Sequence, residues 1–206
     1  ITTKDEIDYI RENPQEFVTL ETTPQHLTFF APDIYDQINT FAQINPPIRT
    51  KDHRDGIWKG LDDGLIEIIG SDHSPHTKEQ KNQPYPKSPS GMPGTQTIGI
   101  IMTDYYLKGK ITLDKLIKLL CTNPCKLFGI KNRGEIKEGN IADLTIYNLN
   151  KKYEIKNEWI VSKCGWTPFD GMELGVSPFG TIISGKKIVW DQKLITKSQG
   201  QPFSFN

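Results

Sequence analysis

The spacing of apolar side chains predicts two helices near the start of the chain. Ile7 and Ile10 are placed as on one face of a helix, Thr3 is a suitable N-cap, and an Asn-Pro pair ends the pattern. A helix is therefore expected over residues 3–12. A second helix is expected over residues 52–63, where the same kind of spacing recurs.

Two compact apolar runs are typical of short buried strands. They cover residues 17–21 and 65–70, and each follows a predicted helix. Clusters of polar side chains come directly after both runs, at residues 22–26 and 71–76. Helices that alternate with strands indicate a parallel α/β sheet, in which loops converge at the carboxyl ends of the strands. The two polar clusters are therefore expected at corresponding strand ends.

Residues 78–94 are rich in Pro and Gly and poor in apolar side chains, which predicts a long loop without secondary structure of its own. Loops of this length in compact domains are usually functional. Helical spacing then resumes, and beyond Gly129 turns and strand-like runs take over, with a hairpin expected around Gly185 and Lys186. The expected helices lie at 95–107, 112–120 and 123–128, and the expected strands lie at 142–147 and within 181–190.

The charge balance excludes several classes of partner. The 206 residues include 25 Lys and Arg and 25 Asp and Glu, so the formal net charge is zero, whereas a nucleic-acid or membrane-surface binder needs a basic surface. A small molecule is therefore the expected partner. No apolar run approaches the roughly 20 residues of a membrane span. The three cysteines form no C-x-x-C pair, which fits reduced thiols in a cytoplasmic protein.

Asp72 is the leading catalytic candidate. It lies in the sequence S-D-H-S-P-H at residues 71–76, directly after a predicted strand. Catalytic groups collect at that end of the strands in parallel α/β folds. A carboxylate placed there can ligate a metal ion and accept a proton from an activated water. The alternative is that Asp72 caps the following turn and that the neighbouring histidines are solvated, because Asp and His both favour turns.

Three further segments offer polar groups for a site. Glu21 and His26 are candidates for a metal ligand, although a single histidine in a loop is more often a surface or supporting group. Asn45 precedes two prolines that fix an extended backbone, so it is interpreted either as an inward-pointing amide or as part of a rigid connector. Ser90 and Gly91 lie in a Gly-rich turn, whose backbone amides can bind a carboxylate or a ring carbonyl. The order GxxxxGK[ST] of a phosphate loop is absent, which excludes nucleotide binding.

Six motifs, in the right order, resemble the dihydroorotases, a family within the amidohydrolase superfamily of metal-dependent barrels. Two of them are E-x-x-P-H-H-L and S-D-H-A-P-H-T in that family. The matching stretches are ETTPQHL at 21–27, NPPIR at 45–49, SDHSPHT at 71–77, PSGMPGTQT at 89–97, NPCKLFGI with the signature G-x-I-x-x-G-x-x-A-D-L-x-I at 123–146, and WTPFDG at 166–171. The resemblance therefore covers nearly the whole chain.

The resemblance implies a reaction and a role for each matched residue. The reaction is the reversible interconversion of N-carbamoyl-L-aspartate and L-dihydroorotate in pyrimidine biosynthesis, with a zinc-activated hydroxide attacking the ring amide in the hydrolytic direction. Asp72 matches the aspartate that ligates the metal and acts as general base and acid. His76 matches a histidine that binds the substrate carboxylate, and Asn45 matches a substrate-binding asparagine. Ser90 and Gly91 match the stretch that contacts the dihydropyrimidine ring.

The sequence departs from the family at several positions. Gln25 replaces the first histidine of the family's pair, and Gln96 replaces its glutamate. The family's H-x-H pair, its bridging Lys or Asp and two further metal histidines belong upstream of Ile1, and none of the four histidines present matches a metal ligand. The Zn²⁺ site, binuclear in the complete enzyme, is therefore expected to need the N-terminal half of the barrel, on the same chain or on another.

The implied fold is the C-terminal part of a (β/α)8 TIM-type amidohydrolase barrel over residues 1–130, followed by a small β-rich accessory domain over residues 131–206. The implied assembly is a cytoplasmic homodimer. Two alternatives stand beside a dihydroorotase: another cyclic amidohydrolase, such as an allantoinase or a dihydropyrimidinase, and a catalytically silent subunit that scaffolds a partner enzyme. His76 and the N-P-P-I-R segment favour an acidic pyrimidine precursor, and the presence of both Asp72 and His76 argues against a silent subunit.

Overall fold

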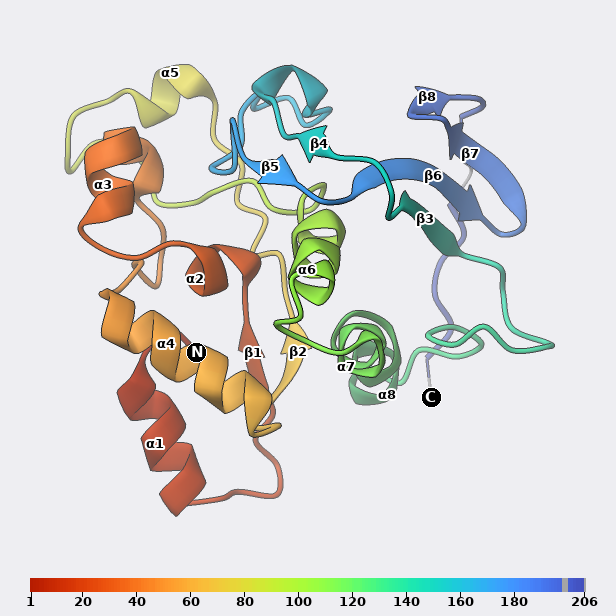
Figure 1. Cartoon of the computed structure of the whole chain (residues 1–206), viewed down its shortest axis with the longest axis horizontal. Helices are drawn as coiled ribbons and strands as arrows, with labels where there is room; N and C mark the ends of the chain where they lie inside the picture. The colour runs from red at the N-terminus through yellow and green to blue at the C-terminus, as the bar shows by residue number, and fades with distance from the viewer. Residues whose placement is uncertain (198–199, 206) are drawn as a thin grey trace. The chain divides into compact units, whose positions relative to one another are not determined.

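The chain is a mixture of helices and short strands (Figure 1). The computed structural model describes residues 1–197 and 200–205. Within these residues, no helix has both the length and the apolar character that crossing a membrane requires.

Internal contacts divide the chain into two compact units. The first contains residues 1–99 and 154–172, and the second contains residues 100–153 and those from 173 onward. The residues within each unit contact one another more densely than they contact the other unit. The boundary between residues 130 and 131, which was placed on sequence motifs, stays a prediction.

Two short parallel strands form the sheet of the first unit. β1 (Leu20–Thr22) pairs with β2 (Ile66–Ile69), and the first residues and the last residues of the two strands stand opposite each other. This pairing confirms the parallel arrangement that the alternation of helices and strands predicts. β1 begins later than the apolar run at residues 17–21 indicated, because Phe17 lies in a turn before the strand and is 94% exposed.

Two helices of the first unit form where their sequences predict them. α1 (Lys4–Glu12) begins after Thr3, whose hydroxyl accepts from the Glu6 N–H while the Glu6 carboxylate accepts from the Thr3 N–H. α4 (Lys51–Asp62) starts and ends one residue before the predicted range 52–63. The other helical segments of this unit are α2 (Pro24–Thr28), α3 (Asp33–Ile38), the 3-10 helix η1 (Asn39–Ala42), α5 (Lys78–Lys81) and the 3-10 helix η3 (Asn157–Trp159).

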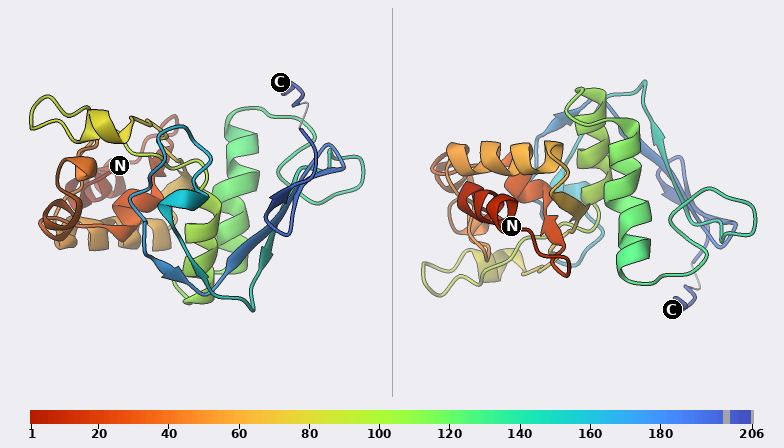
Figure 2. Two further views of the ribbon diagram at one scale, coloured as in Figure 1. Left: turned by 90° about the horizontal axis from the view of Figure 1, so that it is seen from above. Right: turned by 90° about the horizontal axis from the view of Figure 1, so that it is seen from below.

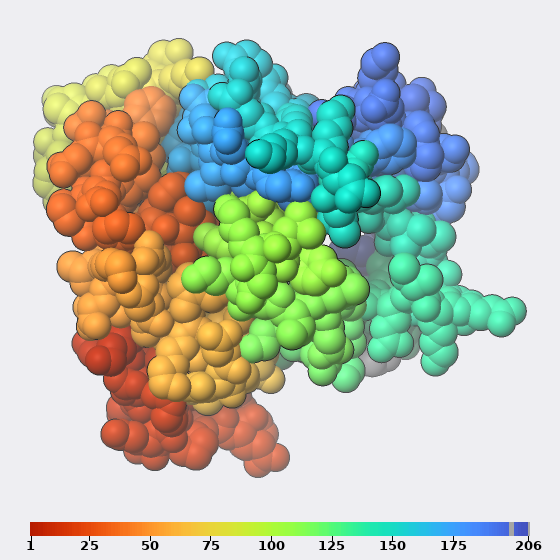
Figure 3. All heavy atoms as spheres, in the orientation of Figure 1, coloured from red at the N-terminus to blue at the C-terminus, as the bar shows by residue number. Residues whose placement is uncertain are grey.

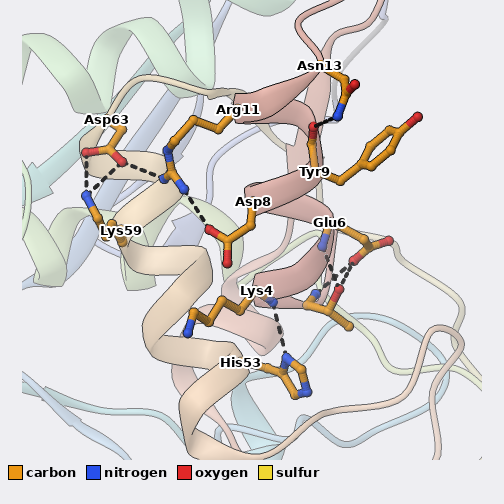
Figure 4. Close-up of polar contacts among 10 residues, drawn as sticks. Lys4, Glu6, Asp8, Tyr9, Arg11, Asn13, His53, Lys59 and Asp63 are labelled. Carbon is orange, nitrogen blue, oxygen red and sulfur yellow. Dashed lines mark hydrogen bonds and ion pairs between the residues drawn. The ribbon is translucent and has the colours of Figure 1, made fainter.

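Helices α1 and α4 lie side by side (Figures 1 and 2). Figure 4 shows Arg11 of α1 bound to Asp8 on its own helix and to Asp63 just after α4, each at 2.7 Å. Exposed ion pairs of this kind contribute little to stability, because water and salt screen them. Ile7 is 1% exposed and packs against Gly60 of α4. Because burying an isoleucine contributes about 1.5 to 3 kcal/mol, the apolar contact stabilises this helix pair more than the ion pairs do.

The segment at residues 78–94 is not free of secondary structure, contrary to its prediction. Thr77 and Gln80 form a capping box that starts α5, in which each side chain binds the main-chain N–H of the other residue. Lys81, the last residue of α5, is fully buried, and its carbonyl accepts from Thr40 Oγ1 at 2.6 Å. In the space-filling view this segment, in yellow, lies beside the orange residues of α3 and η1 (Figure 3). The composition of this segment did not predict that it is held in place, because the groups that hold it are polar.

A buried cluster in the first unit supports the segments that carry the predicted site residues. Trp166 is 3% exposed and lies in this cluster. Ile44, next to Asn45, and Met92, next to Gly91, are buried in it as well. Packing therefore fixes the backbone on one side of each of these polar positions. The buried members are Ile34, Ala42, Ile44, Ile48, Met92, Cys164 and Trp166.

An antiparallel sheet is the main feature of the second unit. Its strand order is β3-β6-β7-β8. β6 and β7 form a hairpin that turns at Ser184 and Gly185, which confirms the hairpin expected at this place. The strands are β3 (Leu144–Asn148), β6 (Ser177–Ile183), β7 (Lys186–Trp190) and β8 (Lys193–Leu194).

Helices precede this sheet along the chain. Asp104 is 3% exposed and accepts from the Gly175 N–H at 2.8 Å, which ties a helix to the strand region within the second unit. Where two helices were expected at 112–120 and 123–128, three helical segments follow one another directly. These three are α7 (Leu113–Ile117), the π-helix η2 (Lys118–Thr122) and α8 (Asn123–Leu127), and α6 (Ile98–Leu107) precedes them. The short strands β4 (Tyr153–Glu154) and β5 (Glu173–Leu174) lie where the chain passes from one unit to the other.

Candidate active site

Four segments of the first unit contain the residues that the sequence singled out. Residues 23–26 follow β1 and residues 70–76 follow β2, so both lie at carboxyl ends of the parallel strands. Residues 43–49 and 89–94 come from the connecting segments. Hydrogen bonds join these four segments to one another. The predicted site residues that they carry are Asn45, Asp72, His76, Ser90 and Gly91.

Asp72 has a left-handed backbone, with φ of 42°. Residues other than glycine rarely adopt this conformation, and Asp and Asn tolerate it best. Such strain costs on the order of 1 to 3 kcal/mol and collects at functional sites. The side chain is exposed, and no N–H among the described residues donates to its carboxylate. Asp72 therefore does not cap the following turn, and its carboxylate is open to a ligand.

His26 is a buried supporting residue. It is 3% exposed, and its Nε2 lies 3.0 Å from the Pro46 carbonyl oxygen while its Nδ1 lies 2.8 Å from Thr23 Oγ1. A carbonyl only accepts, so Nε2 carries the hydrogen and the Thr23 hydroxyl donates to Nδ1. Burial lowers the pKa of His26, although the bond to Pro46 and the charge of Asp72 oppose this shift. With both nitrogens engaged, His26 holds the segment that begins at Asn45 and does not face a metal ion.

His76 connects the segment after β2 to the Gly-rich turn. Its Nε2–H donates to the Ser90 carbonyl at 3.1 Å, and its own carbonyl accepts from Trp166 Nε1 at 2.8 Å. The ring is therefore held in one orientation, with Nδ1 as its remaining polar atom. Two residues that the sequence predicted to bind the substrate, His76 and Ser90, are in direct contact.

Gln43 fixes the Gly-rich turn from a second side. Its carbonyl accepts from the Gly91 N–H at 2.9 Å, and its Nε2 donates to Ser90 Oγ at 3.2 Å. The Gly91 N–H is therefore occupied and is not available to a ligand. The prediction that backbone amides of this turn can bind a ligand does not hold for Gly91. Gly91 has φ of 144°, and a Cβ there would lie 2.5 Å from the Ser74 carbonyl oxygen, so only glycine fits. No sequence pattern marks Gln43.

His73, next to Asp72, faces the end of the same turn. Its Nδ1 accepts from the N–H groups of Gly94 at 3.1 Å and Thr95 at 3.4 Å. A Cβ on Gly94 would lie 2.3 Å from the Ser71 carbonyl oxygen, so the close approach of the two segments requires a glycine. His73 also lines a cavity of about 620 Å³, whose other walls include Thr95, Gln96, Ile160, Val161 and Thr167.

The two glutamines that depart from the family pattern have different environments. Gln96 is fully bonded, because its Nε2 donates to the Trp159 carbonyl at 2.7 Å and its Oε1 accepts from the Val161 N–H at 2.9 Å. A glutamate could not donate to the Trp159 carbonyl. Gln25 is fully buried and donates to the Ser71 carbonyl at 3.1 Å, but its Oε1 has no partner among the described residues. An unpaired buried acceptor costs about 1 to 3 kcal/mol.

The residues that the structure describes do not bring together a set of metal ligands by themselves. Among the described residues, no three His, Cys, Asp or Glu side chains come together in a way that could hold a metal ion. His26 is fully hydrogen-bonded, and the Nδ1 atoms of His53 and His73 accept from main-chain N–H groups. A catalytic zinc usually has about three protein ligands, and the described residues do not supply such a set together.

Comparison with known proteins finds relatives that match over most of the chain. A dihydroorotase from Endomicrobium trichonymphae is 38% identical over 193 residues, which is 92% of this chain and 45% of the relative. A dihydroorotase from Pyrococcus furiosus is 32% identical over 201 residues, which is 98% of this chain and 46% of the relative. The chain thus spans a little under half the length of these relatives.

Solved structures agree with this relationship. An L-hydantoinase (dihydropyrimidinase) from Arthrobacter aurescens superimposes with a TM-score of 0.87 at 28% identity, covering 96% of this chain and 45% of that one. A dihydropyrimidinase from Brevibacillus agri gives a TM-score of 0.85 at 26% identity, covering 95% of this chain and 44% of that one. The sequence model of the amidohydrolase family matches residues 9–188. By sequence and by fold, this chain belongs to the amidohydrolase family.

Proposed function

We propose that the chain is the C-terminal part of a dihydroorotase, which interconverts N-carbamoyl-L-aspartate and L-dihydroorotate. The observation that carries the proposal is the likeness to dihydroorotases, at 32% to 38% identity over most of the chain. The structural support is the set of hydrogen bonds that joins the segments of Asn45, Asp72, His76 and Ser90 at the strand ends. These residues are the ones proposed to do the chemistry.

Asp72 is the proposed general base and acid. In the hydrolytic direction its carboxylate accepts a proton from the attacking water, and the water oxygen bonds to the ring amide carbon. The C–N bond then breaks, and Asp72 returns the proton to the leaving nitrogen. Cyclisation follows the same steps in reverse. An exposed carboxylate without a hydrogen-bond donor of its own suits this work, because no internal bond has to break before it accepts a proton.

The other proposed substrate contacts come from segments that hydrogen bonds join to the segment of Asp72. His76 binds the substrate carboxylate through Nδ1 when its ring carries both protons, because Nε2–H already donates to Ser90. Asn45 is exposed on a segment that His26 holds, and its amide is proposed to bind the substrate. The ring lies against Ser90 and Gly91, where the Ser90 N–H and the Gly91 carbonyl make no hydrogen bond with the described residues.

The remaining parts of the enzyme are proposed to come from outside this chain. Two parallel strands are too few to close a barrel, and eight are needed. The other strands and the further Zn²⁺ ligands would lie on the N-terminal half, on the same chain or on another. The four-stranded sheet of the second unit would be the accessory domain, and the complete enzyme would be a cytoplasmic homodimer.

Comparing three cyclic amides tests the proposed substrate. The complete enzyme, meaning this chain with the rest of its barrel, is expected to favour dihydroorotate over dihydrouracil and hydantoin by at least about 10-fold to 150-fold in kcat/KM. Only dihydroorotate has a carboxylate, and one charge-assisted hydrogen bond contributes about 1.5 to 3 kcal/mol. Faster turnover of dihydrouracil or hydantoin would favour the dihydropyrimidinase alternative, which the solved structures support. Inactivity towards all three would favour a silent subunit.

Zinc content provides a second test that does not depend on turnover. The 206-residue chain alone is expected to retain well under one equivalent of Zn²⁺ after dialysis, because Asp72 is its sole proposed ligand. The complete enzyme is expected to retain at least one equivalent under the same conditions, as measured by atomic emission. Stoichiometric zinc on the isolated chain, lost on Asp72→Asn, would contradict the assignment of further ligands to the other half.

A further inference from the structure

Lys81 is an unusual residue because its ammonium group is inside the first unit. Its side chain is fully buried at the end of α5. Nζ donates to the Gln43 carbonyl at 2.9 Å and to the Pro89 carbonyl at 2.8 Å, and it lies 5.9 Å from the centre of the Trp166 ring. No carboxylate among the described residues forms an ion pair with it.

The two carbonyl partners of Lys81 belong to the segments that carry proposed substrate contacts. Pro89 directly precedes Ser90, and Gln43 lies two residues before Asn45. The Gln43 carbonyl also accepts from the Gly91 N–H. The Gln43 carbonyl oxygen therefore accepts hydrogen bonds from both the Lys81 ammonium and the Gly91 N–H. Lys81 thus binds at the point where the two segments join.

The main chain of Lys81 makes the same connection again. Its carbonyl accepts from Thr40 Oγ1 at 2.6 Å and from Ser88 Oγ at 3.1 Å. Thr40 belongs to the segment that leads to Gln43, and Ser88 belongs to the segment that leads to Ser90. Four hydrogen bonds to one residue thus fix these two segments at a set separation.

Burying an ammonium without a counter-charge is costly. The burial lowers the pKa of Lys81 from 10.5 to about 8. A methionine or leucine would fill the same space without that cost, but neither could donate to two carbonyls. The stability of the fold alone therefore does not account for a lysine at this position, whereas positioning of the Gly-rich turn does.

We infer that Lys81 is a positioning residue for substrate binding, which holds Ser90 and Gly91 in place by binding the Gln43 and Pro89 carbonyls. The inference rests on the proposed function, because it takes the Ser90–Gly91 stretch as the surface that receives the substrate ring. Lys81 itself does not touch the substrate. Its effect is expected on substrate affinity, since the turn is proposed to bind the substrate ring and supplies no reacting group.

Amide hydrogen exchange tests the positioning without reference to activity. In the complete enzyme, Lys81→Met is expected to speed exchange of the Gly91 N–H by about 10-fold, the effect of losing roughly one charge-assisted bond. Exchange within α4 should not change. Lys78→Met, an exposed lysine on the same helix, is the matched control and should alter neither. Unchanged exchange at Gly91 in a folded Lys81→Met enzyme would overturn the inference.

Steady-state kinetics of the complete enzyme test the consequence for binding. Lys81→Met is expected to raise KM for dihydroorotate by about 10-fold and to leave kcat within about 3-fold, because the lost positioning affects ground state and transition state alike. A merely structural role would instead lower kcat in proportion to the folded fraction and leave KM unchanged, and that result would overturn the inference. If the unsubstituted enzyme does not act on dihydroorotate, the proposed function fails, but the exchange result still decides whether Lys81 holds the turn.

A second variant covers the case in which Lys81→Met does not fold. Lys81→Gln retains two N–H donors without the charge, but its shorter side chain reaches one of the two carbonyls. It is expected to raise KM and the Gly91 N–H exchange rate by about 3-fold each, which is less than the effect of Lys81→Met. A folded Lys81→Gln variant that matches Lys78→Met in both measurements would overturn the inference.

Discussion

Asp72→Asn is expected to lower kcat of the complete enzyme by roughly 10²-fold to 10⁴-fold, the usual range for losing general acid and base catalysis. The substitution removes the proton acceptor and the negative charge but keeps the shape of the side chain. It also suits the backbone, because Asn tolerates the left-handed conformation at this position, where φ is 42°, as well as Asp does. Alanine would add backbone strain, so the loss of the carboxylate could not be separated from a change in the backbone. Single-turnover rates with dihydroorotate measure the chemical step directly.

The chain offers a matched control for this substitution. Asp191 is also exposed and left-handed, with φ of 49°, and it lies in the turn between β7 and β8 of the second unit. Asp191→Asn makes the same chemical change on the same backbone and should leave kcat unchanged. If Asp72→Asn kept near-normal kcat, Asp72 would not be the general base, and the silent-subunit alternative would become the better one.

His76→Ala is expected to raise KM for dihydroorotate by about 10-fold to 150-fold with a much smaller change in kcat. The substrate carboxylate is charged in both the ground state and the transition state, so losing its partner weakens both equally. One charge-assisted hydrogen bond contributes about 1.5 to 3 kcal/mol, which corresponds to this range. Initial rates over a wide range of substrate concentrations separate KM from kcat.

A second histidine provides the comparison for His76. His53 lies on α4, where its Nδ1 accepts from the Lys4 N–H at 3.2 Å (Figure 4). His53→Ala should therefore change stability slightly and leave KM unaltered. A further comparison uses dihydrouracil, which lacks the carboxylate, so any activity towards it should respond little to His76→Ala. A fall in kcat with an unaltered KM for dihydroorotate would contradict carboxylate binding by His76.

Local signals in the sequence determined the elements and the candidate chemistry. Thr3 and Glu6 cap α1 from within four residues of each other, so the start of that helix can be read directly from the chain. Runs of apolar side chains marked β1 and β2, and their alternation with helices predicted parallel pairing, which the register confirms. The motif around Asp72 pointed to the amidohydrolases, and the family match confirms that relationship.

Tertiary structure alone decided how the polar residues are used. His26 is buried and holds the Pro46 carbonyl, although a loop histidine is more often exposed. Gln96 finds its two partners 63 and 65 residues further along the chain, at Trp159 and Val161. Lys81 lies in a polar segment that composition marks as a loop, and yet it is fully buried. The burial of a polar side chain depends on which distant segments pack over it and offer it hydrogen bonds, and no local pattern of residues encodes that.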